Sequence, residues 1–399
     1  RQVYREIIEN EREGKYLGGT IQTIPHVTNL IKDKIFKASE ETKSDVMIVE
    51  VGGTIGDIEG QPFIEAIRQF RSEFGQDNSL FMHLTLLPKL GATGEVKTKP
   101  TQHSVNALRA MGIQPDFLVC RSDEEFDNSI KSKLSLHCDV KLQRIFSLET
   151  LDTIYAVPKD LKTNGLDVAV LNALGKNTFP KSNLRKWNKV VERIRKPIGE
   201  VTIGVVGKYL DLNYAYKSLF EALTHGGISN NVKVNIKNID TDKLEKNKNK
   251  TVFNGLSGIL VPGGFGKRGS EGKIFASKYA RENKIPFFGI CFGMQMAVVD
   301  VARNLLEYKS ASSSEFGKTD TPVIGLLTEW IKDEEIQKRD LQSEYGGTMR
   351  LGSYPAILKK GSKVRNIYGS KKVNERHRHR YEAVSYTHLR AHETGRNLV

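Results

Sequence analysis

The sequence predicts an α/β protein with two doubly wound parallel-sheet domains. Short apolar segments of strand length alternate with segments whose apolar residues recur at helical spacing, the pattern of parallel sheets covered by helices. This alternation starts again after Lys196-Pro197-Ile198-Gly199, where proline and glycine mark a boundary. A length of 399 residues is enough for two separate cores. We therefore expect one domain over residues 1–196 and a second over residues 197–382.

Each expected element of the first domain follows from its own apolar spacing. Near-continuous apolar runs predict buried strands over residues 45–51 and 80–87. Further strands are expected over 117–120 and 144–148, and helical spacing predicts helices over 3–13, 27–36, 62–74, 104–111, 129–136 and 183–195.

The second domain is expected to repeat this alternation. Strands are predicted over 201–206, 232–239, 258–261 and 286–290, with helices over 215–225, 273–283 and 294–306. A glycine-bounded strand is expected over 346–352, and the segment 376–382 is a dense basic run that a solvated surface patch would also explain. Residues 383–399 show no clear period, so we expect disorder there.

The composition is that of a globular protein with an excess of basic residues. Hydrophobic residues make up 38% of the chain, and no apolar run approaches the roughly 20 residues that cross a bilayer, so no membrane span is expected. The net charge of +14 invites a nucleic-acid-binding interpretation, but the lysines are scattered, which favours a solvated surface. Three cysteines without Cys-x-x-Cys pairing, Cys120, Cys138 and Cys291, argue against a disulfide framework and favour the cytoplasm.

An acidic, glycine-rich loop follows the strand expected over residues 45–51. Glu50 lies toward the carboxyl end of that strand, where ligands gather in α/β sheets. In the loop over residues 52–60, glycines allow a ligand to approach closely, and Asp57 and Glu59 add carboxylates that suit a hard cation or ligand hydroxyls. An ordinary acidic turn is the alternative interpretation.

A basic segment lies between the strand over 80–87 and the next expected helix. Residues 94–103 contain two lysines, two threonines and a glutamine just before a helix N-terminus, which suits an anion. The Walker A spacing is absent. An exposed basic turn explains the segment equally well.

Cys291 lies in Gly289-Ile290-Cys291-Phe292-Gly293, the cysteine counterpart of a Gly-x-Ser-x-Gly nucleophile elbow. A strand is expected before it and a helix after it, so the thiol would stand exposed in a tight turn. Amides at the helix N-terminus favour a thiolate and hold a developing oxyanion. A core cysteine at a strand end is the alternative that this motif leaves open.

A second glycine-rich segment precedes this elbow. Gly264, Gly266 and Gly269 have the Gly-x-Gly-x-x-Gly spacing of a dinucleotide site, but they follow the third strand of their domain instead of the first. We instead expect the amides of Gly263 and Gly264 to face the strand end that carries Cys291 and to form part of an oxyanion hole.

Six motifs together make the chain resemble the CTP synthases, which aminate UTP using glutamine and ATP. In chain order they are Glu50-Val-Gly-Gly-Thr-Ile-Gly-Asp-Ile-Glu59, Gly94-Glu-Val-Lys-Thr-Lys-Pro-Thr-Gln-His-Ser104, Val261-Pro-Gly-Gly-Phe-Gly266, Gly289-Ile-Cys-Phe-Gly-Met-Gln295, Gly346-Gly-Thr-Met-Arg-Leu-Gly352 and Glu375-Arg-His-Arg-His-Arg-Tyr-Glu382. The similarity spans about residues 1–382. It implies a ligase of pyrimidine biosynthesis, cytoplasmic and homotetrameric, with a P-loop-like amidoligase domain followed by a class I glutamine amidotransferase domain.

The resemblance places the nucleotide sites in the first domain. Glu50 corresponds to a ligand of Mg²⁺, and Glu149, Thr150 and Leu151 to a stretch that touches the co-substrate ATP, with Glu149 and Thr150 replacing a frequent Lys-Asp. The positions that hold UTP, and CTP as feedback inhibitor, correspond to Asp57, Ile58, Glu59, Lys97, Thr98, Lys99, Pro100, Thr101, Gln102 and Lys133.

In the second domain the resemblance makes Cys291 the nucleophile that forms a thioester with glutamine and releases ammonia. GTP is implied as an allosteric activator. The oxyanion donors are Gly263, Gly264 and Phe292, and the glutamine-binding positions are Gly264, Phe292, Gly293, Met294, Gln295, Glu315 and Arg380.

The chain also departs from the family. The family's phosphate-binding glycine loop lies upstream of Arg1, and its His-Pro-Glu motif, which completes the catalytic triad, does not occur in the sequence. We therefore expect a partial chain that lacks both family termini and has little glutaminase activity, with residues 383–399 an unmatched or artefactual tail. His377 and His379 correspond to binding-loop residues, which argues against a catalytic role for them.

Two other functions are alternatives to the enzyme. A non-catalytic family member acting as an assembly or regulatory partner would keep the fold without the reaction. A nucleic-acid-binding protein would bind in a strongly salt-dependent way and show no preference for UTP.

Overall fold

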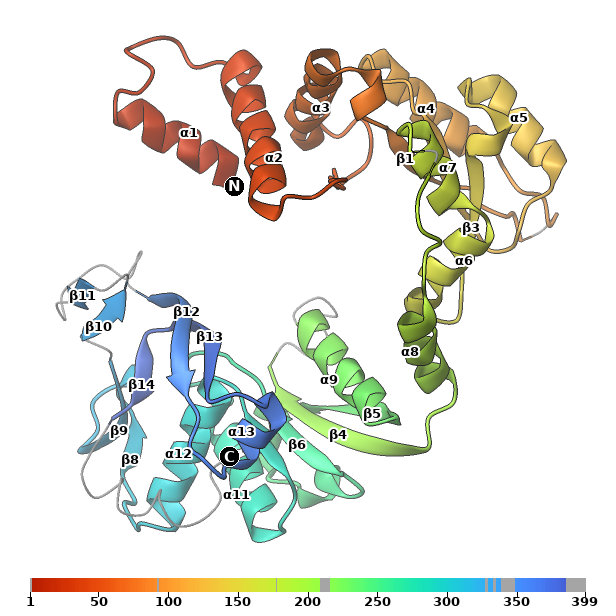
Figure 1. Ribbon diagram of the computed structural model, residues 1–399. Coiled ribbons are helices and arrows are strands. Elements are labelled where there is room, and N and C mark those ends of the chain that lie inside the picture. Colours follow the sequence, from red (N-terminus) through yellow and green to blue (C-terminus); the bar gives the residue numbers. More distant parts are fainter. Residues whose placement is uncertain are drawn as a thin grey trace. The chain divides into compact units, whose positions relative to one another are not determined.

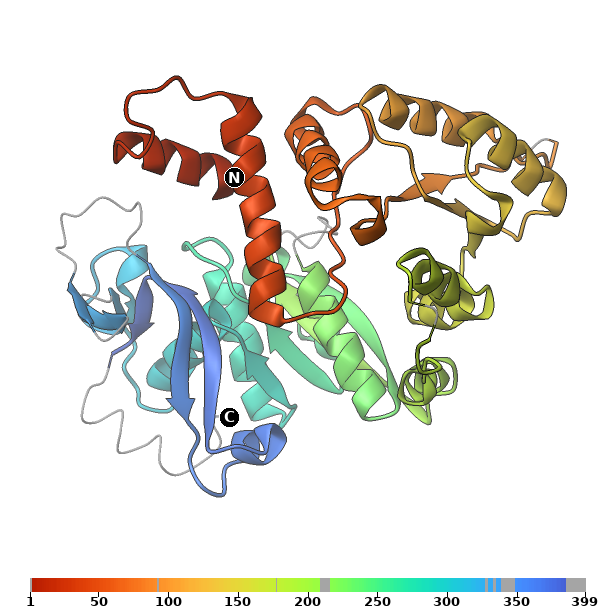
Figure 2. The same ribbon diagram turned by 45° about the horizontal axis from the view of Figure 1, so that its top comes forward.

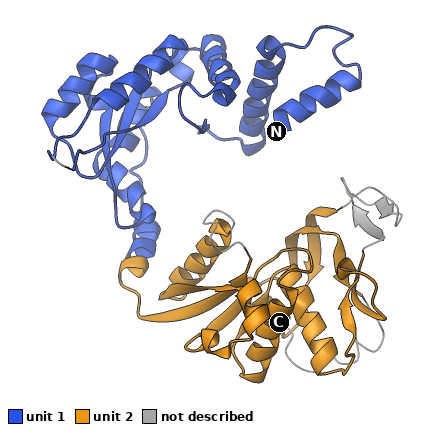
Figure 3. Ribbon diagram, turned by 180° about the vertical axis from the view of Figure 1, so that it is seen from behind, with its two compact units in different colours: residues 1–191 blue, residues 192–399 orange. Residues whose placement is uncertain are grey.

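The computed structural model describes residues 2–91, 93–176, 178–208, 216–326, 329–332, 335–338 and 349–384. The chain divides into two compact units, residues 1–191 and 192–399, each described here by itself (Figure 3). Within the described residues, no helix combines the length and apolar character needed to cross a membrane. The expected tail, apart from Ala383 and Val384, lies outside the described residues.

A three-stranded parallel sheet is the framework of the first unit (Figure 1). Its strands lie in the order β1 (Met82–Leu86), β2 (Phe117–Ser122) and β3 (Ile145–Glu149). Helices connect and follow them in the alternation that the sequence predicts. They are α4 (Lys99–Ala110), α5 (Asn128–Cys138), α6 (Val157–Thr163), α7 (Leu166–Ala173) and α8 (Arg185–Arg195), the last of which runs past the boundary between the units.

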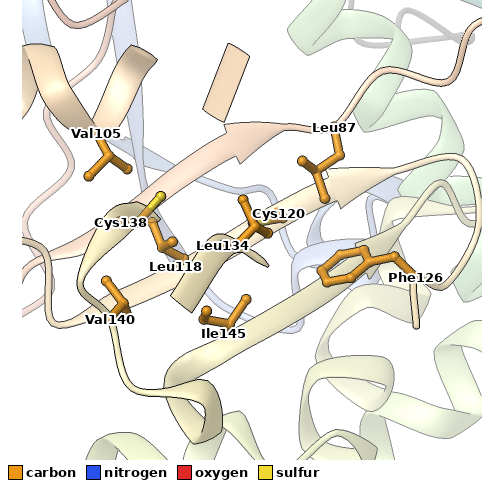
Figure 4. Packing of buried hydrophobic residues seen from close by; sticks show 9 residues of the cluster. All are labelled: Leu87, Val105, Leu118, Cys120, Phe126, Leu134, Cys138, Val140 and Ile145. Atoms are coloured by element: carbon orange, nitrogen blue, oxygen red, sulfur yellow. The ribbon is translucent and has the colours of Figure 1, made fainter. Parts of the chain in front are cut away.

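Helices cover both faces of β2, the central strand. Leu118 and Cys120 pack in a cluster with residues of α4 and α5. Figure 4 shows the side chains of this cluster. Phe117 and Val119 point the other way and pack with residues of α6 and α7. Successive side chains of a strand face opposite sides of the sheet, so this strand is apolar at nearly every position. The expected α/β architecture is confirmed for this unit.

Three helices precede the sheet: α1 (Gln2–Arg12), α2 (Thr28–Thr42) and α3 (Gln61–Phe74). They share an apolar cluster that includes Ile7, Ile31 and Ala66. The predicted helices are present, although α2 ends six residues later than residue 36, where the apolar spacing stops. The last two turns of α2 are polar and largely exposed, so the spacing of apolar residues could not show that the helix continues through them.

The prediction of a buried strand over residues 45–51 is wrong. No strand forms there, and Ile48 is 90% exposed. The apolar, branched sequence has strand propensity, but a strand forms only where another can pair with it. Among the described residues β1 pairs along one edge, with β2, and segment 45–51 is not part of the sheet.

Two further expectations in this unit need correction. β1 was predicted to be a buried strand, but Met82, Leu84 and Leu86 on one of its faces are 47%, 63% and 57% exposed, since α6 and α7 cover β2 and β3 instead. Helix α4 begins at Lys99, five residues before the predicted start, because Pro100 fits the first turn of a helix.

The second unit is built on a four-stranded parallel sheet in the order β5-β4-β6-β7. The chain adds β5 on one side of β4 and then β6 on the other, so the carboxyl ends of β4 and β6 flank a topological switch point. The strands are β4 (Gly199–Gly207), β5 (Val232–Asp240), β6 (Gly258–Val261) and β7 (Phe287–Gly289). The helices are α9 (Lys217–Ser229), α10 (Thr241–Asn247), α11 (Ser270–Glu282) and α12 (Phe292–Asn304).

Short strands complete the second unit. β8 (Ala311–Ser313), β9 (Thr321–Leu326) and β14 (Tyr381–Ala383) form one sheet, and β10 (Glu329–Lys332) pairs with β11 (Glu335–Lys338). β12 (Arg350–Ile357) and β13 (Lys372–His379) form an antiparallel pair connected through α13 (Lys363–Tyr368) (Figure 2). Residues 376–379 of the basic run belong to β13 and residues 381–382 to β14, whereas residues 346–348 of the expected glycine-bounded strand lie outside the described residues.

A buried carboxylate joins α11 to α12. Asp300 of α12 is fully buried and accepts hydrogen bonds from Nε and Nη2 of Arg281, each 3.1 Å long. Ser277 and Asn304 donate to the same carboxylate at 3.2 and 2.9 Å. Because Asp300 is paired on every side, its charge is tolerated in the interior.

Replacing Asp300 with alanine is expected to lower the free energy of unfolding by about 3 kcal/mol, because Arg281 would keep a partly buried, unpaired charge. Urea denaturation of the purified variant measures this. The control is Glu282→Ala, which removes an exposed ion pair of 3.8 Å with Lys278 and should change stability by less than about 0.5 kcal/mol. Equal losses in the two variants would contradict the expectation.

Candidate active site

Cys291 lies in the turn between β7 and α12, as the sequence predicts. Its backbone has φ +51° and ψ −107°, a conformation that costs a non-glycine residue roughly 1–3 kcal/mol. The residue is exposed, whereas Cys120 and Cys138 are buried. A strained turn that holds an exposed thiol at a helix N-terminus has the geometry of a nucleophile elbow.

Two glycines let this turn pack against its neighbours. A Cβ on Gly293 would lie 2.0 Å from the carbonyl oxygen of Val261, and a Cβ on Gly289 would lie 2.6 Å from the backbone nitrogen of Met294. Atoms do not approach that closely without a bond, so β6, β7 and α12 meet here only because both positions lack a side chain.

Opposing effects act on the thiol of Cys291. Partial loss of water around the sulfur is the largest, and it raises the pKa because it disfavours the thiolate. The backbone N–H of Phe292 and the charge of Lys273 lower the pKa, whereas the charge of Glu315 raises it. The net effect is a raised pKa, so the thiol needs a base to become an efficient nucleophile at neutral pH.

The segment after β6 runs beside the elbow. A Cβ on Gly263 would lie 3.7 Å from Cβ of Cys291, and a Cβ on Gly264 would lie 3.6 Å from Cδ1 of Phe292. Farther along this segment, the backbone N–H of Gly266 donates to Oε1 of Glu315 at 2.7 Å. The structure thus brings Gly263, Gly264 and Glu315 to the elbow.

The other predicted glutamine-binding residues have different surroundings. Gln295 is buried, and its Nε2 donates to the carbonyl oxygen of Tyr381 at 2.7 Å, which joins α12 to the start of β14. This contact brings the turn with half-buried Arg380 close to α12. Met294 is 44% exposed. The side chain of Gln295 therefore supports the frame of the site.

Three acidic residues predicted to serve nucleotides share one cavity in the first unit. Glu50, Asp57 and Glu59 line an open cavity of about 460 Å³ together with glycines of the same loop. The loop closes on itself because the backbone N–H of Thr54 donates to Oδ2 of Asp57 at 3.1 Å. Carboxylate oxygens on a glycine-rich loop are a donor set that suits Mg²⁺.

The basic segment divides into buried and surface residues. Thr98, Thr101 and Gln102 are buried. Thr101 donates from Oγ1 to the carbonyl oxygen of Leu86 at 3.1 Å, and Gln102 donates from Nε2 to Oγ1 of Thr98 at 3.0 Å. Thr101 thus fixes the start of α4 to the end of β1, and the bond from Gln102 to Thr98 lies within the start of α4 itself. Lys99, Pro100 and Ile58 are exposed.

Lys97 and Lys133, both predicted to contact UTP, act on Glu95, which was not among the predicted site residues. Nζ of Lys97 lies 2.5 Å from Oε2 of Glu95. Lys97, mainly through this hydrogen bond, and the charge of Lys133 both lower the pKa of Glu95. The lysines are thus close enough to act on one anion.

The predicted ATP-contacting stretch follows the carboxyl end of β3. Glu149 is the last residue of that strand, and the backbone N–H of Thr150 donates to the carbonyl oxygen of Ser122 at the end of β2, at 2.9 Å. Leu151 follows and is half-buried. This stretch and the end of β1 therefore lie at the same edge of the sheet, where ligands bind in α/β proteins.

His377, His379 and Glu382 form a cluster in the described residues that has the composition of a metal site. Nδ1 of His377 lies 2.9 Å from Nε2 of His379, which is 3.5 Å from Oε1 of Glu382. Nη1 of Arg350 already lies 2.5 Å from the same carboxylate oxygen. Because this guanidinium satisfies Glu382, we interpret the cluster as a polar network.

Two lysines of this site were not predicted from the sequence. Lys273 and Lys208 are 1% and 7% exposed, and both lie over the ring of Phe292, next to Cys291. Lysine is rarely buried, and neither position differs in sequence from the many surface lysines of this chain. The one sign of this burial in the sequence is that Lys273 interrupts an otherwise apolar helix face.

Two family models and two curated relatives agree on one family. The model described as CTP synthase N-terminus matches residues 1–176, and the model described as Glutamine amidotransferase class-I matches residues 212–394. The CTP synthase of Rhizobium johnstonii is 53% identical over 380 residues, 95% of this chain and 70% of the relative. That of Zymomonas mobilis is 53% identical over 382 residues, with the same coverage. The solved glutaminase domain of Trypanosoma brucei CTPS with bound acivicin is 36% identical and covers 46% of this chain and 68% of that one, with a TM-score of 0.40.

Proposed function

The chain belongs to the CTP synthase family, and on that premise we propose that it makes CTP from UTP, ATP and glutamine. Cys291 attacks the side-chain amide of glutamine, forms a thioester and releases ammonia. In the first unit, ATP phosphorylates the C4 oxygen of UTP, and ammonia then displaces that phosphate. The single observation that carries the proposal is the strained elbow that exposes Cys291.

For the glutamine site, we assign the oxyanion to the amides of Phe292, Gly263 and Gly264. Their closeness to Cys291 supports this assignment, because donors held where negative charge develops stabilise it without reorganisation. Arg380 takes the α-carboxylate of glutamine with its planar fork of N–H groups. The remaining contacts come from Gly293, Met294 and Glu315 and from the backbone of Gln295, whose side-chain amide is engaged with Tyr381.

For the nucleotide sites, we propose that Glu50 holds Mg²⁺, which neutralises phosphate charge when it is bound. Its shared cavity with Asp57 and Glu59 supports this role. UTP, and CTP as inhibitor, are contacted by Asp57–Glu59, Lys97–Gln102 and Lys133, and ATP by Glu149–Leu151. Family membership further leads us to propose GTP as activator and a homotetramer.

We also propose that this chain hydrolyses glutamine slowly. A base must take the proton of Cys291, whose pKa is raised. Among the described residues, neither histidine of the basic run is hydrogen-bonded to Cys291, and His377 and His379 bond to each other instead.

The proposal is tested by measuring CTP formation by the purified chain from UTP, ATP and Mg²⁺, with either glutamine or ammonium as the nitrogen source. CTP from ammonium and little from glutamine is the expected result. Binding of UTP with formation of no CTP from either source would contradict the proposed enzyme and favour a non-catalytic partner.

A further inference from the structure

Lys273 is a buried cation beneath the Cys291 elbow. It lies in the first turn of α11 and is 1% exposed. Its Nζ donates to the carbonyl oxygen of Pro262 at 3.0 Å. A lysine enclosed this completely destabilises the fold unless its charge finds compensation, so its position needs an explanation.

The ammonium group of Lys273 lies close to the segment Pro262–Gly264, which contains two of the proposed oxyanion donors. Its Nζ lies 4.9 Å from the ring centroid of Phe292, a favourable distance for a cation over an aromatic face. It would lie 3.2 Å from a Cβ on Gly264. Lys273 thus contacts the segment at Pro262 and Gly264 and also the residue that follows Cys291.

In the part of the chain that the structure describes, Lys208, the Cys291 thiol and the Glu315 carboxylate are the other titratable groups around Lys273 and Cys291. Lys208 donates from Nζ to the carbonyl oxygen of Phe265 at 3.0 Å and lies 5.9 Å from the same ring. Burial, mainly, and the charge of Lys208 lower the pKa of Lys273 and Cys291 raises it, with a net lowering to about 8. The negative charge of Glu315 raises the pKa of Cys291.

We propose that Lys273 is a positioning residue that holds the Pro262–Gly264 segment against the elbow and whose positive charge stabilises the Cys291 thiolate. The proposal rests on the proposed role of Cys291 as nucleophile and adds to it a source of thiolate stabilisation. The hydrogen bond to Pro262 accounts for the positioning. The buried charge lies over the ring of Phe292, the residue after Cys291, and its lowering effect on the pKa of the thiol accounts for the stabilisation.

The charge and the hydrogen bond can be separated by two variants. Lys273→Met keeps the length of the side chain and loses both, whereas Lys273→Gln keeps an N–H donor for Pro262 and loses the charge. The matched control is Lys278→Met, on the exposed side of the same helix, where Nζ bonds to Asn304 at 3.1 Å.

The measurement is the rate at which iodoacetamide alkylates Cys291 in the full chain between pH 6 and 10, followed by mass spectrometry. Cys120 and Cys138 are buried, and burial raises the pKa of each to about 11, so they serve as unreactive internal controls. At pH 7 both Lys273 variants should be alkylated roughly fivefold more slowly than the parent. This is the loss of thiolate expected when one nearby positive charge is removed, even if water screens that charge as it does in bulk solution. Lys278→Met should react at the parent rate.

The same variants distinguish this role from a merely structural one. Removing a cation that burial disfavours should leave the melting temperature of Lys273→Met equal to or above that of the parent, while its thiol loses reactivity. Parent-like alkylation of folded Lys273→Gln would overturn the proposal. If neither variant folds, the parent protein still tests the proposal. An alkylation rate of Cys291 whose pH dependence fits the titration of one thiol, with no coupling to Lys273, whose pKa is lowered to about 8, would overturn the proposal as well. Retention of glutamine hydrolysis by Cys291→Ala would instead refute the proposed function.

Discussion

Replacing Cys291 with alanine is expected to abolish hydrolysis of glutamine and the CTP formation that depends on it. The thioester cannot form without the sulfur, and loss of a nucleophile lowers turnover by roughly 10³-fold or more. Release of ammonia or glutamate from glutamine measures the first activity. Because the expected parent rate is low, covalent labelling by an electrophilic glutamine analogue provides a second readout, and the variant should show none.

Ammonium-dependent CTP formation is the internal control for this variant. It bypasses Cys291, so it should persist at the parent level and show that the nucleotide sites are intact. Cys138→Ala is the matched control among the cysteines, since that thiol is buried in the first unit. Equal labelling of parent and Cys291→Ala would mean that another residue is the nucleophile.

Replacing Gly293 with alanine is expected to destabilise the second unit by at least about 4 kcal/mol. The new methyl group would lie 2.0 Å from a backbone oxygen of β6, and a backbone atom in a central strand cannot move aside as a flexible side chain can. Thermal unfolding of the variant measures the loss. Labelling of Cys291 should disappear as well, because relief of the clash moves α12 away from β6.

The control for this variant is Gly226→Ala in α9, where a Cβ meets no atom within 4 Å. Alanine favours a helix over glycine by up to about 1 kcal/mol, so this change should raise the melting temperature slightly. A Gly293→Ala variant as stable as Gly226→Ala would contradict the clash and the close packing inferred for the elbow.

The sequence predicted the alternation of strands and helices because both sheets are parallel and covered by helices. β2 is buried on both faces and reads as a continuous apolar run, and the Gly-x-Cys-x-Gly motif placed Cys291 correctly between β7 and α12. These features depend on local spacing and on glycine, and both are visible in the residues themselves.

Features that depend on distant neighbours could not be predicted in this way. Residues 45–51 have the composition of a strand, but pairing decides whether one forms. The burial of Lys273 follows from how α11 packs against the elbow, and local spacing showed it only as a lysine that interrupts an apolar helix face. For Gln295, the motif identified the position but not that its amide is engaged with Tyr381.

The exposed face of β1 affects how this protein behaves at high concentration. Met82, Leu84 and Leu86 present an apolar row on a strand whose pairing, within the described residues, involves one edge only. A strand with an unpaired edge and an apolar face is a template on which another chain can add its own strand. We therefore expect any self-association of this chain at high concentration to start at β1, and a lysine in place of Leu84 to reduce the association measured by light scattering.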